Sequence, residues 1–186
     1  MKTDKFNYDL PEHLIAQYPS SERTDSKLLV AIESIQHQVF KEIGNYINKG
    51  DLLILNKTSV IPARLYGEKS TGGKIEILLE RFLSDNQTLT QIRSSRTPKE
   101  GAELVFSFRG QRFLATVEGR QDNFFILNWS DHPKSLFEQY GQIPLPPYMN
   151  RAAEKLDEER YETIYADPNQ KASVAAPTAG MHFDQE

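Results

Sequence analysis

The chain of 186 residues contains no cysteine, no extended apolar run and no excess of basic residues. Without cysteine it forms no disulfide, no Cys-ligated zinc or iron–sulfur site, and it offers no thiol nucleophile. Its first ten residues, MKTDKFNYDL, lack the apolar centre of a secretory leader, and no apolar run approaches the length that spans a membrane. We therefore expect a cytoplasmic protein without membrane contact.

Histidine is also scarce. The four histidines, His13, His37, His132 and His182, are scattered, and no two stand at the i, i+4 spacing of a helical metal-binding pair. We therefore expect no metal site.

Net charge is −4, and it is unevenly distributed. Residues 1–60 carry 7 basic and 8 acidic side chains, residues 61–144 carry 11 and 10, and residues 145–186 carry 4 and 8. A protein that holds nucleic acid by charge alone is basic overall, which this chain is not. Any RNA contact must therefore be local, and half of all Lys and Arg lie in the middle segment.

The first 63 residues have the pattern of an α/β protein. Pro11 is placed to begin a short helical turn. Phe40, Ile43 and Ile47 recur at helical spacing. The run LLILN (52–56) is apolar without alternation, which is typical of a strand in a parallel sheet covered on both faces.

From about residue 64 the pattern becomes that of an all-β unit. Five short segments separated by polar turns predict strands, at 74–82, 88–93, 103–109, 112–118 and 123–129. Short strands joined in this way favour a small barrel or sandwich. Helical character returns at HPKSLFEQYG, where Pro133 begins the helix and Gly141 ends it. The predicted fold class is α/β: a host domain (1–63 and 145–186), incomplete at its C-terminus, with an inserted barrel-like all-β domain (64–144).

The segment SVAAPTAGMHF (173–183) is built of unusually small side chains. Small residues let a backbone approach a ligand closely, and glycine adopts backbone angles closed to other residues. Its few polar groups are Ser173, Thr178 and His182, which favours a ligand-cradling turn with one titratable side chain. A tight strand-to-helix connection is the alternative.

Three further segments are candidates for binding. Asn56 and Thr58 follow the predicted buried strand, where α/β sheets place ligands, although such residues also cap local turns. The prolines of IPLPPYMNR (143–151) stiffen the chain. The segment is either a rigid arm that presents Tyr148 and Arg151 or a linker back to the host domain. The segment DEERYETIYA (157–166) predicts a helix, either an amphipathic surface helix or the wall of a polar site.

Six segments taken in order carry a family resemblance: YDLPEHLIAQYP, GDLLILNKTSVIPARLYG, GGKIEILLER, IPLPPYMNR, DEERYETIYA and SVAAPTAGMHF. Together they resemble the S-adenosylmethionine:tRNA ribosyltransferase-isomerase family of queuosine synthesis, over about residues 6–183. The resemblance implies transfer and isomerisation of a ribosyl group from S-adenosylmethionine onto 7-aminomethyl-7-deazaguanine at the tRNA wobble position. The products would be epoxyqueuosine-tRNA, adenine and methionine. It further implies no cofactor besides this co-substrate, no metal, and a monomer for the complete enzyme.

This chemistry depends on the sulfonium of the donor. The positive sulfur acidifies the adjacent ribose carbon, so a base can remove a proton there, and sulfur and adenine both serve as leaving groups. Such a site needs an acid/base group, a pocket for adenine, and acidic or aromatic groups facing the sulfonium. An imidazole suits the first role because its ordinary pKa, about 6.5, lies near neutral pH.

The resemblance implies roles for particular residues of this chain. His182 and Thr178 are the catalytic candidates, although His182 has the alternative of a structural histidine packed with Met181 and Phe183. Aromatic rings and carboxylates at Tyr161, Tyr165, Asp157 and Glu162 would face the sulfonium. Arginines would meet the phosphates or sugars of tRNA. The remaining substrate-binding candidates are Asn56, Thr58, Arg64, Tyr148, Arg151, Arg160, Ala175, Ala176, Pro177, Ala179 and Gly180.

The sequence departs from the family pattern at a few positions. It has NKTSVIPARL where the pattern has NDTRVIPARL, so Lys57 reverses a charge beside Thr58, and Lys27 in RTDSKLLV replaces the usual Arg. Family members also continue well past Phe183. We therefore expect either an N-terminal part of an enzyme, inactive alone and marginally stable, or a naturally shortened relative.

Two other functions are open on sequence alone. A non-catalytic RNA-binding protein would use the β-rich segment and its basic loop RSSRTPK (93–99), which is otherwise a solvated turn. The second, a conventional methyltransferase, is disfavoured, because it would carry a Gly-rich turn after its first strand and none follows LLILN.

Overall fold

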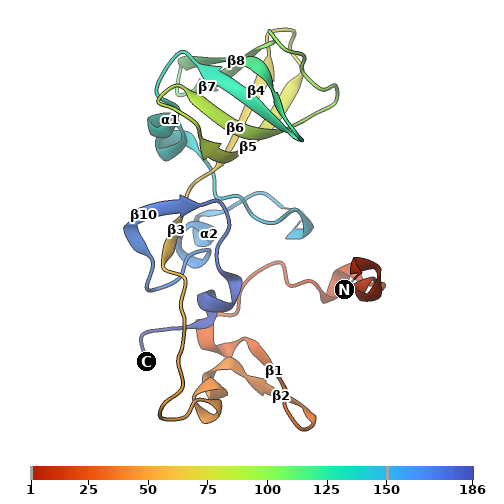
Figure 1. The fold of residues 1–186 in the computed structure, drawn as a ribbon, viewed down its shortest axis with the longest axis vertical. Coiled ribbons are helices and arrows are strands. Elements are labelled where there is room, and N and C mark those ends of the chain that lie inside the picture. Colours follow the sequence, from red (N-terminus) through yellow and green to blue (C-terminus); the bar gives the residue numbers. More distant parts are fainter. Residues whose placement is uncertain (1, 150) are drawn as a thin grey trace.

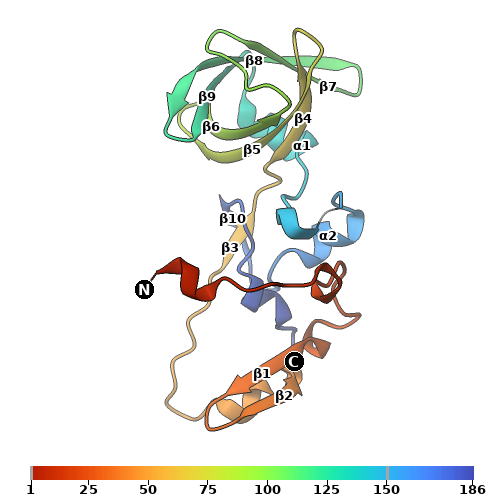
Figure 2. The same cartoon turned by 90° about the vertical axis from the view of Figure 1, so that its right-hand side faces the viewer.

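The computed structural model describes residues 2–149 and 151–186, and the chain extends along one long axis (Figure 1). A closed β-barrel lies at one end of this axis, and a two-stranded hairpin lies at the other. A short parallel strand pair and helix α2 lie between them, and a second view shows the same order (Figure 2).

The barrel has six antiparallel strands that close in the order β4-β5-β6-β9-β8-β7. Their bounds are β4 (Arg64–Lys69), β5 (Lys74–Phe82), β6 (Gln87–Ser94), β7 (Glu103–Phe108), β8 (Gln111–Gln121) and β9 (Phe124–Trp129). The predicted barrel is confirmed. Five strands were expected and six are present. The sequence did not predict β4, because β4 has only one inward apolar residue, Leu65, before Gly67 and charged residues end the alternation.

Alternating apolar residues fill the barrel. Leu104, Phe106 and Leu127 are completely buried, and the Trp129 ring lies 5.0 Å from the ring of Phe106. Helix α1 (Pro133–Tyr140) begins and ends where the sequence predicts, and its buried Phe137 packs edge-on against Trp129 at 5.9 Å. This aromatic cluster anchors the helix to the barrel, because each ring removes a large apolar area from water.

Gly67 is required by a close approach inside β4. A Cβ placed there would lie 2.6 Å from the carbonyl oxygen of Val105 and 2.7 Å from the ring of Phe106. Such distances are shorter than van der Waals contact, so only glycine lets β4 lie this close to β7. By contrast, a Cβ on Gly119 of β8 would meet nothing within 4 Å.

The part outside the barrel is α/β only in part. Strand β3 (Thr58–Val60) pairs in parallel with β10 (Asp167–Ser173), with irregular register, beside α2 (Lys155–Arg160). Among the described residues this parallel sheet has two strands. Residues 58–60 and 167–173 are therefore brought side by side although more than a hundred positions separate them.

The prediction that residues 52–56 form a buried strand is wrong for this structure. The segment has no regular structure, and Leu52 and Ile54 are each 83% exposed. Its apolar run predicted burial, but a strand also needs hydrogen-bonding neighbours. β10 pairs with the chain two residues further on, and no strand of the described residues pairs with 52–56.

Three local predictions also differ from the structure. Residues Lys27–Ala31 (β1) and Ile35–Val39 (β2) form an antiparallel hairpin that was not expected, and the helical patterns near residues 12 and 40 form 3₁₀ helices, Glu12–Leu14 and Phe40–Tyr46. Helix α2 ends at Arg160, so residues 161–165 do not continue it, and Tyr161 caps its C-terminus. In the described part of the chain no helix is long and apolar enough to cross a membrane.

The close approach at Gly67 generates a stability prediction. We expect Gly67→Ala to lower the free energy of unfolding by about 1–3 kcal/mol, because the added methyl forces β4 away from β7. Urea unfolding followed by the fluorescence of the single tryptophan, Trp129, measures this change. Gly119→Ala is the matched control and should change stability little. Equal effects of the two substitutions would contradict the packing argument.

Candidate functional site

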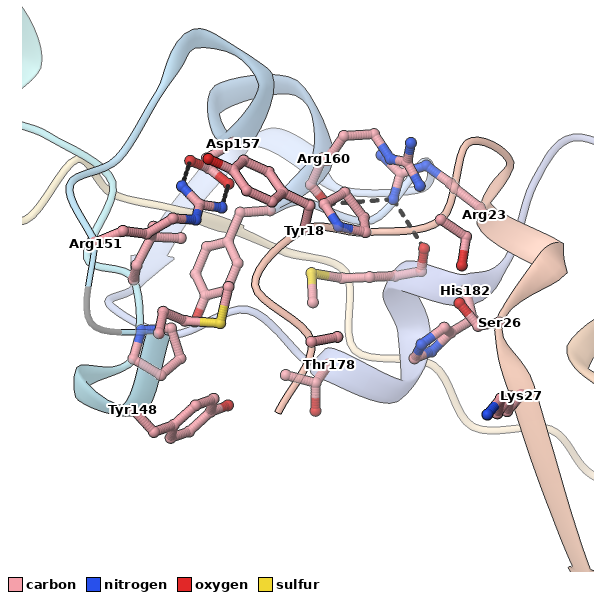
Figure 3. A pocket seen from close by; sticks show the side chains of 18 of the residues that line it. Tyr18, Arg23, Ser26, Lys27, Tyr148, Arg151, Asp157, Arg160, Thr178 and His182 are labelled. Carbon is pink, nitrogen blue, oxygen red and sulfur yellow. Dashed lines mark hydrogen bonds and ion pairs between the residues drawn. The ribbon is translucent and has the colours of Figure 1, made fainter. Parts of the chain in front are cut away.

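A cavity of ≈ 560 Å³ lies where four segments converge, outside the barrel (Figure 3). Its walls come from residues 14–27, from the proline-rich arm around 145–151, from the α2 region, and from the 3₁₀ helix Thr178–His182. We call it the central cavity. Segments from both ends of the sequence therefore build one site.

A paired arginine and aspartate form one wall of the central cavity. The Nη1 and Nη2 atoms of Arg151 donate to Oδ2 and Oδ1 of Asp157 at 2.6 and 2.7 Å, a bidentate geometry. The Asp157 side chain is 6% exposed and that of Arg151 13% exposed. Asp157 also accepts the backbone N–H of Glu154 at 2.8 Å, which caps the first turn of α2.

The same arginine binds the N-terminal segment. Arg151 Nε donates to the carbonyl oxygen of Gln17 at 2.8 Å, and its guanidinium carbon lies 4.5 Å from the centre of the Tyr18 ring. The Tyr18 hydroxyl in turn donates to Glu154 at 3.0 Å. All three nitrogens of Arg151 therefore have partners within the chain, so it positions the cavity wall and has little capacity left for a ligand.

These contacts shift the pKa values of the groups involved. The hydrogen bond from Arg151 lowers the pKa of Asp157, although burial works against it. The hydrogen bond to Asp157 raises the pKa of Arg151, and the bond to Glu154 raises that of Tyr18. Asp157 is therefore a carboxylate whose charge is already matched within the protein.

A second arginine holds the opposite wall. Arg23 donates to the carbonyl oxygens of Glu162 and Met181 at 2.9 Å and of Glu159 at 3.0 Å. It thereby joins the C-terminal end of α2, where helix carbonyls lack intrahelical partners, to the 3₁₀ helix Thr178–His182. Burial, followed by the nearby charge of Arg160, lowers the pKa of Arg23.

His182 presents one ring nitrogen as a candidate base. Nδ1 lies 3.1 Å from the carbonyl oxygen of Ala179, and a carbonyl only accepts, so this contact places the proton on Nδ1. In the neutral ring Nε2 is then the basic nitrogen. The ring packs against Phe40 with centroids 5.3 Å apart and also lines the central cavity.

Two of the small residues before His182, Ala176 and Gly180, are buried against the protein itself, whereas Ala175 and Ala179 are exposed. A Cβ on Gly180 would overlap the Tyr165 hydroxyl and lie 2.9 Å from Thr163. Ser173 and Ala175 hydrogen-bond each other locally, and Ala176 is buried. In this structure the absence of a side chain at Gly180 therefore allows close packing against residues 163–165.

The predicted site residues fall into two groups. Seven line the central cavity: Tyr148, Arg151, Asp157, Arg160, Tyr161, Thr178 and His182. Nine lie outside that lining: Asn56, Thr58, Arg64, Tyr165, Ala175, Ala176, Pro177, Ala179 and Gly180. Asn56 caps its own turn by accepting hydrogen bonds from the backbone N–H and the hydroxyl of Thr58. Glu162 accepts hydrogen bonds from the Ser59 hydroxyl and the Val60 N–H, so its side chain is bound to β3.

Sequence reasoning missed the N-terminal wall. Tyr18, Arg23, Ser26 and Lys27 all line the central cavity. The available signal was the family resemblance: Tyr18 lies in YDLPEHLIAQYP, and Arg23, Ser26 and Lys27 lie in RTDSKLLV, where Lys27 replaces the usual Arg. Within the described residues no group of three or more acidic or histidine side chains is arranged to hold a metal ion.

The Arg151–Asp157 pair generates a pH-dependent prediction. We expect Asp157→Asn to lower the free energy of unfolding by about 3 kcal/mol near pH 7, because it leaves a largely buried guanidinium without its counter-charge. The folded-state pKa of Asp157 is lowered, so its stabilising effect is complete above the unfolded-state pKa of about 3.9 and is lost as the pH falls through the folded value.

Urea unfolding at a series of pH values measures this difference. The difference in the free energy of unfolding between wild type and Asp157→Asn should be constant near neutral pH and become smaller in acid. Glu158→Gln, on the exposed side of the same helix, is the control and should change stability by less than about 0.5 kcal/mol. A gap that does not narrow in acid would argue against the pair.

Comparisons with known proteins agree on one family. A family model described as "Queuosine biosynthesis protein" matches residues 3–186. The S-adenosylmethionine:tRNA ribosyltransferase-isomerase of Acinetobacter baylyi is 47% identical over 189 residues, and the protein of the same name from Acinetobacter baumannii strain AYE is 44% identical over 188. Each alignment covers 100% of this chain and 54% of the relative, so the chain spans about half the length of these curated relatives.

Among solved structures, that of S-adenosylmethionine tRNA ribosyltransferase from Thermotoga maritima shows 35% sequence identity. The superposition covers 78% of this chain and 52% of that one, with a TM-score of 0.36. The family assignment therefore rests on sequence, over nearly the whole chain. The chain belongs to the family of queuosine biosynthesis proteins.

Proposed function

We propose that this chain provides the S-adenosylmethionine site of a tRNA ribosyltransferase-isomerase. The reaction would transfer and isomerise the ribosyl group of S-adenosylmethionine onto 7-aminomethyl-7-deazaguanine at the wobble position of tRNA. Epoxyqueuosine-tRNA, adenine and methionine would be released. The observation that carries the proposal is that family motifs from both ends of the chain meet around the central cavity.

The lining of the central cavity suits a sulfonium donor. Three tyrosines, Tyr18, Tyr148 and Tyr161, contribute aromatic surface, and ring faces attract a cation. The charge of Asp157 is already paired with Arg151, so in this proposal the aromatic rings, and not Asp157, contact the sulfonium. The Arg151–Asp157 pair keeps the cavity wall in place. Leu145 and Pro146 add apolar surface for a flat adenine ring.

His182 is the acid/base group in this proposal. Its Nδ1 is held by Ala179, which fixes the ring and leaves Nε2 to accept a proton from the carbon beside the sulfonium. Thr178 lies one turn earlier on the same 3₁₀ helix, and its hydroxyl can donate to a ribose oxygen. The proposal needs no metal and no further cofactor.

The domain division expected from the sequence is part of the same proposal. Residues 64–144 would form an insertion in an α/β host made of residues 1–63 and 145–186. The closed barrel and the pairing of β3 with β10 across the insertion support this division.

The reaction can be tested with a chimera. The chain is joined to the part of the Acinetobacter baylyi relative that its alignment does not cover, and is incubated with S-adenosylmethionine and tRNA carrying the deazaguanine base. Mass analysis of the tRNA should show a ribosyl-derived adduct, with adenine released in equal amount. The 186-residue chain alone should release none. Methylated tRNA would contradict the proposal, and RNA binding by a folded chimera without adenine release would favour the non-catalytic alternative.

The role of His182 can be tested in the same chimera. We expect His182→Asn to lower kcat by about 10²–10⁴-fold, the usual contribution of a general acid or base, with a small change in the KM for S-adenosylmethionine. His37→Gln, on the exposed strand β2, is the control and should leave kcat unchanged. A variant at His182 with unaltered kcat would show that this histidine is structural.

A further inference from the structure

A second cavity, of ≈ 320 Å³, adjoins the central cavity on the outer face of the barrel. The two share Leu145, Pro146 and Arg151 as wall residues. We call it the barrel-side cavity. The roles proposed above leave it unused, although it opens beside the site where the donor would react.

Three side chains form a row across the floor of the barrel-side cavity. Tyr66 on β4 pairs with Glu76 on β5, and Glu76 pairs with Arg93 on β6. Their sequence neighbours Leu65 and Ile77 are buried in the barrel, so this row faces outward, because successive strand residues alternate between the two faces. The row therefore places an aromatic ring, a carboxylate and a guanidinium side by side.

The row is held in position from one side. Nε of Arg64 lies 3.0 Å from Oε1 of Glu76, which makes an ion pair, although the Nε–H group forms no hydrogen bond. Nη2 of Arg64 donates to the carbonyl oxygen of Leu145 at 2.9 Å. Backbone hydrogen bonds between Arg64 and Gln142 fix the same junction. Arg64 thereby links the barrel to the arm that walls both cavities.

The other side of the row is open for a ligand. Tyr66 is 43% exposed, and Arg93 is exposed. Within residues 2–149 and 151–186, Arg93 makes no salt bridge and no side-chain hydrogen bond. Beyond it, the exposed Arg96 and Lys99 continue in the loop 93–99, and Lys69 donates to the Arg96 carbonyl and holds that loop.

We propose that the barrel-side cavity binds one unpaired nucleotide of the acceptor RNA. Unpaired bases stack on aromatic side chains, guanidinium groups bind phosphate, and a carboxylate accepts from N–H donors on the edge of a base. Tyr66, Arg93 and Glu76 supply these three contacts in one row. Arg96 and Lys99 follow the phosphates of the next nucleotides, which is the local basic contact that a chain of net charge −4 requires.

The location explains how the acceptor base is presented. The shared wall lets a nucleotide in the barrel-side cavity hold the strand while its neighbour enters the central cavity. The identification of this RNA as tRNA rests on the proposed function, whereas the nucleotide site itself rests on the barrel surface.

Binding of a tRNA anticodon stem-loop to the 186-residue chain tests the proposal. Fluorescence anisotropy should show that Tyr66→Ala weakens binding by about 5-fold or more, the usual loss of one stacked base, while Tyr66→Phe retains it. Arg93→Ala should weaken binding and reduce the slope of log K against log salt by about 0.7, as for one phosphate contact on a single strand.

Arg112→Ala is the matched control, because Arg112 is exposed on β8, the strand opposite β5 in the barrel. It should leave stem-loop binding nearly unchanged. Equal losses in Arg93→Ala and Arg112→Ala would overturn the site in favour of diffuse charge attraction, and so would failure of the wild-type chain to bind the stem-loop.

The outcomes also separate this site from the proposed reaction. Weakened binding in Tyr66→Ala, together with a wild-type chimera that releases no adenine, would keep the nucleotide site and reject the reaction. Adenine release by the chimera, with Tyr66→Ala and Arg93→Ala showing the wild-type KM for tRNA, would keep the reaction and reject the site.

Discussion

The arrangement of the central cavity depends on the buried ion pair between Arg151 and Asp157. This pair connects the proline-rich arm to the first turn of α2, and Arg151 reaches the N-terminal segment through the Gln17 carbonyl. Three segments are therefore fixed by one guanidinium, whose planar set of donors suits several acceptors at once. A lysine has no comparable set of donors, so a lysine in place of Arg151 would hold one of these partners and release the others.

The barrel could be predicted from sequence because its signals are local. Alternation of apolar residues and short polar turns indicated five of the six strands, and α1 begins at Pro133 and ends before Gly141 as expected. The prediction of a strand at 52–56 is wrong, because an apolar run indicates a tendency to burial but does not indicate which segment would cover it or pair with it. Residues at 161–165 also follow helical spacing, yet the Arg23 contacts to carbonyls hold the chain in a turn there.

The candidate site was predicted on one side only. His182, Tyr161 and Asp157 belong to segments with a recognisable pattern, and they line the central cavity. The N-terminal segment adds Tyr18 beside Arg151 and Arg23 on the opposite wall. Their roles arise from contacts with residues far along the chain and leave no periodic trace. The same reason explains Gly180: its small size suggested a ligand, but the neighbour that needs the space is Tyr165.

The contacts around the central cavity also set the order in which the chain can fold during synthesis. Gln17 must wait for Arg151, 134 positions later, and Arg23 for Met181, 158 positions later. At ribosomal rates this is a delay of about seven to thirty seconds, during which the barrel, with its nearer contacts, can already close. The N-terminal segment therefore reaches its final position only after most of the chain has been synthesised.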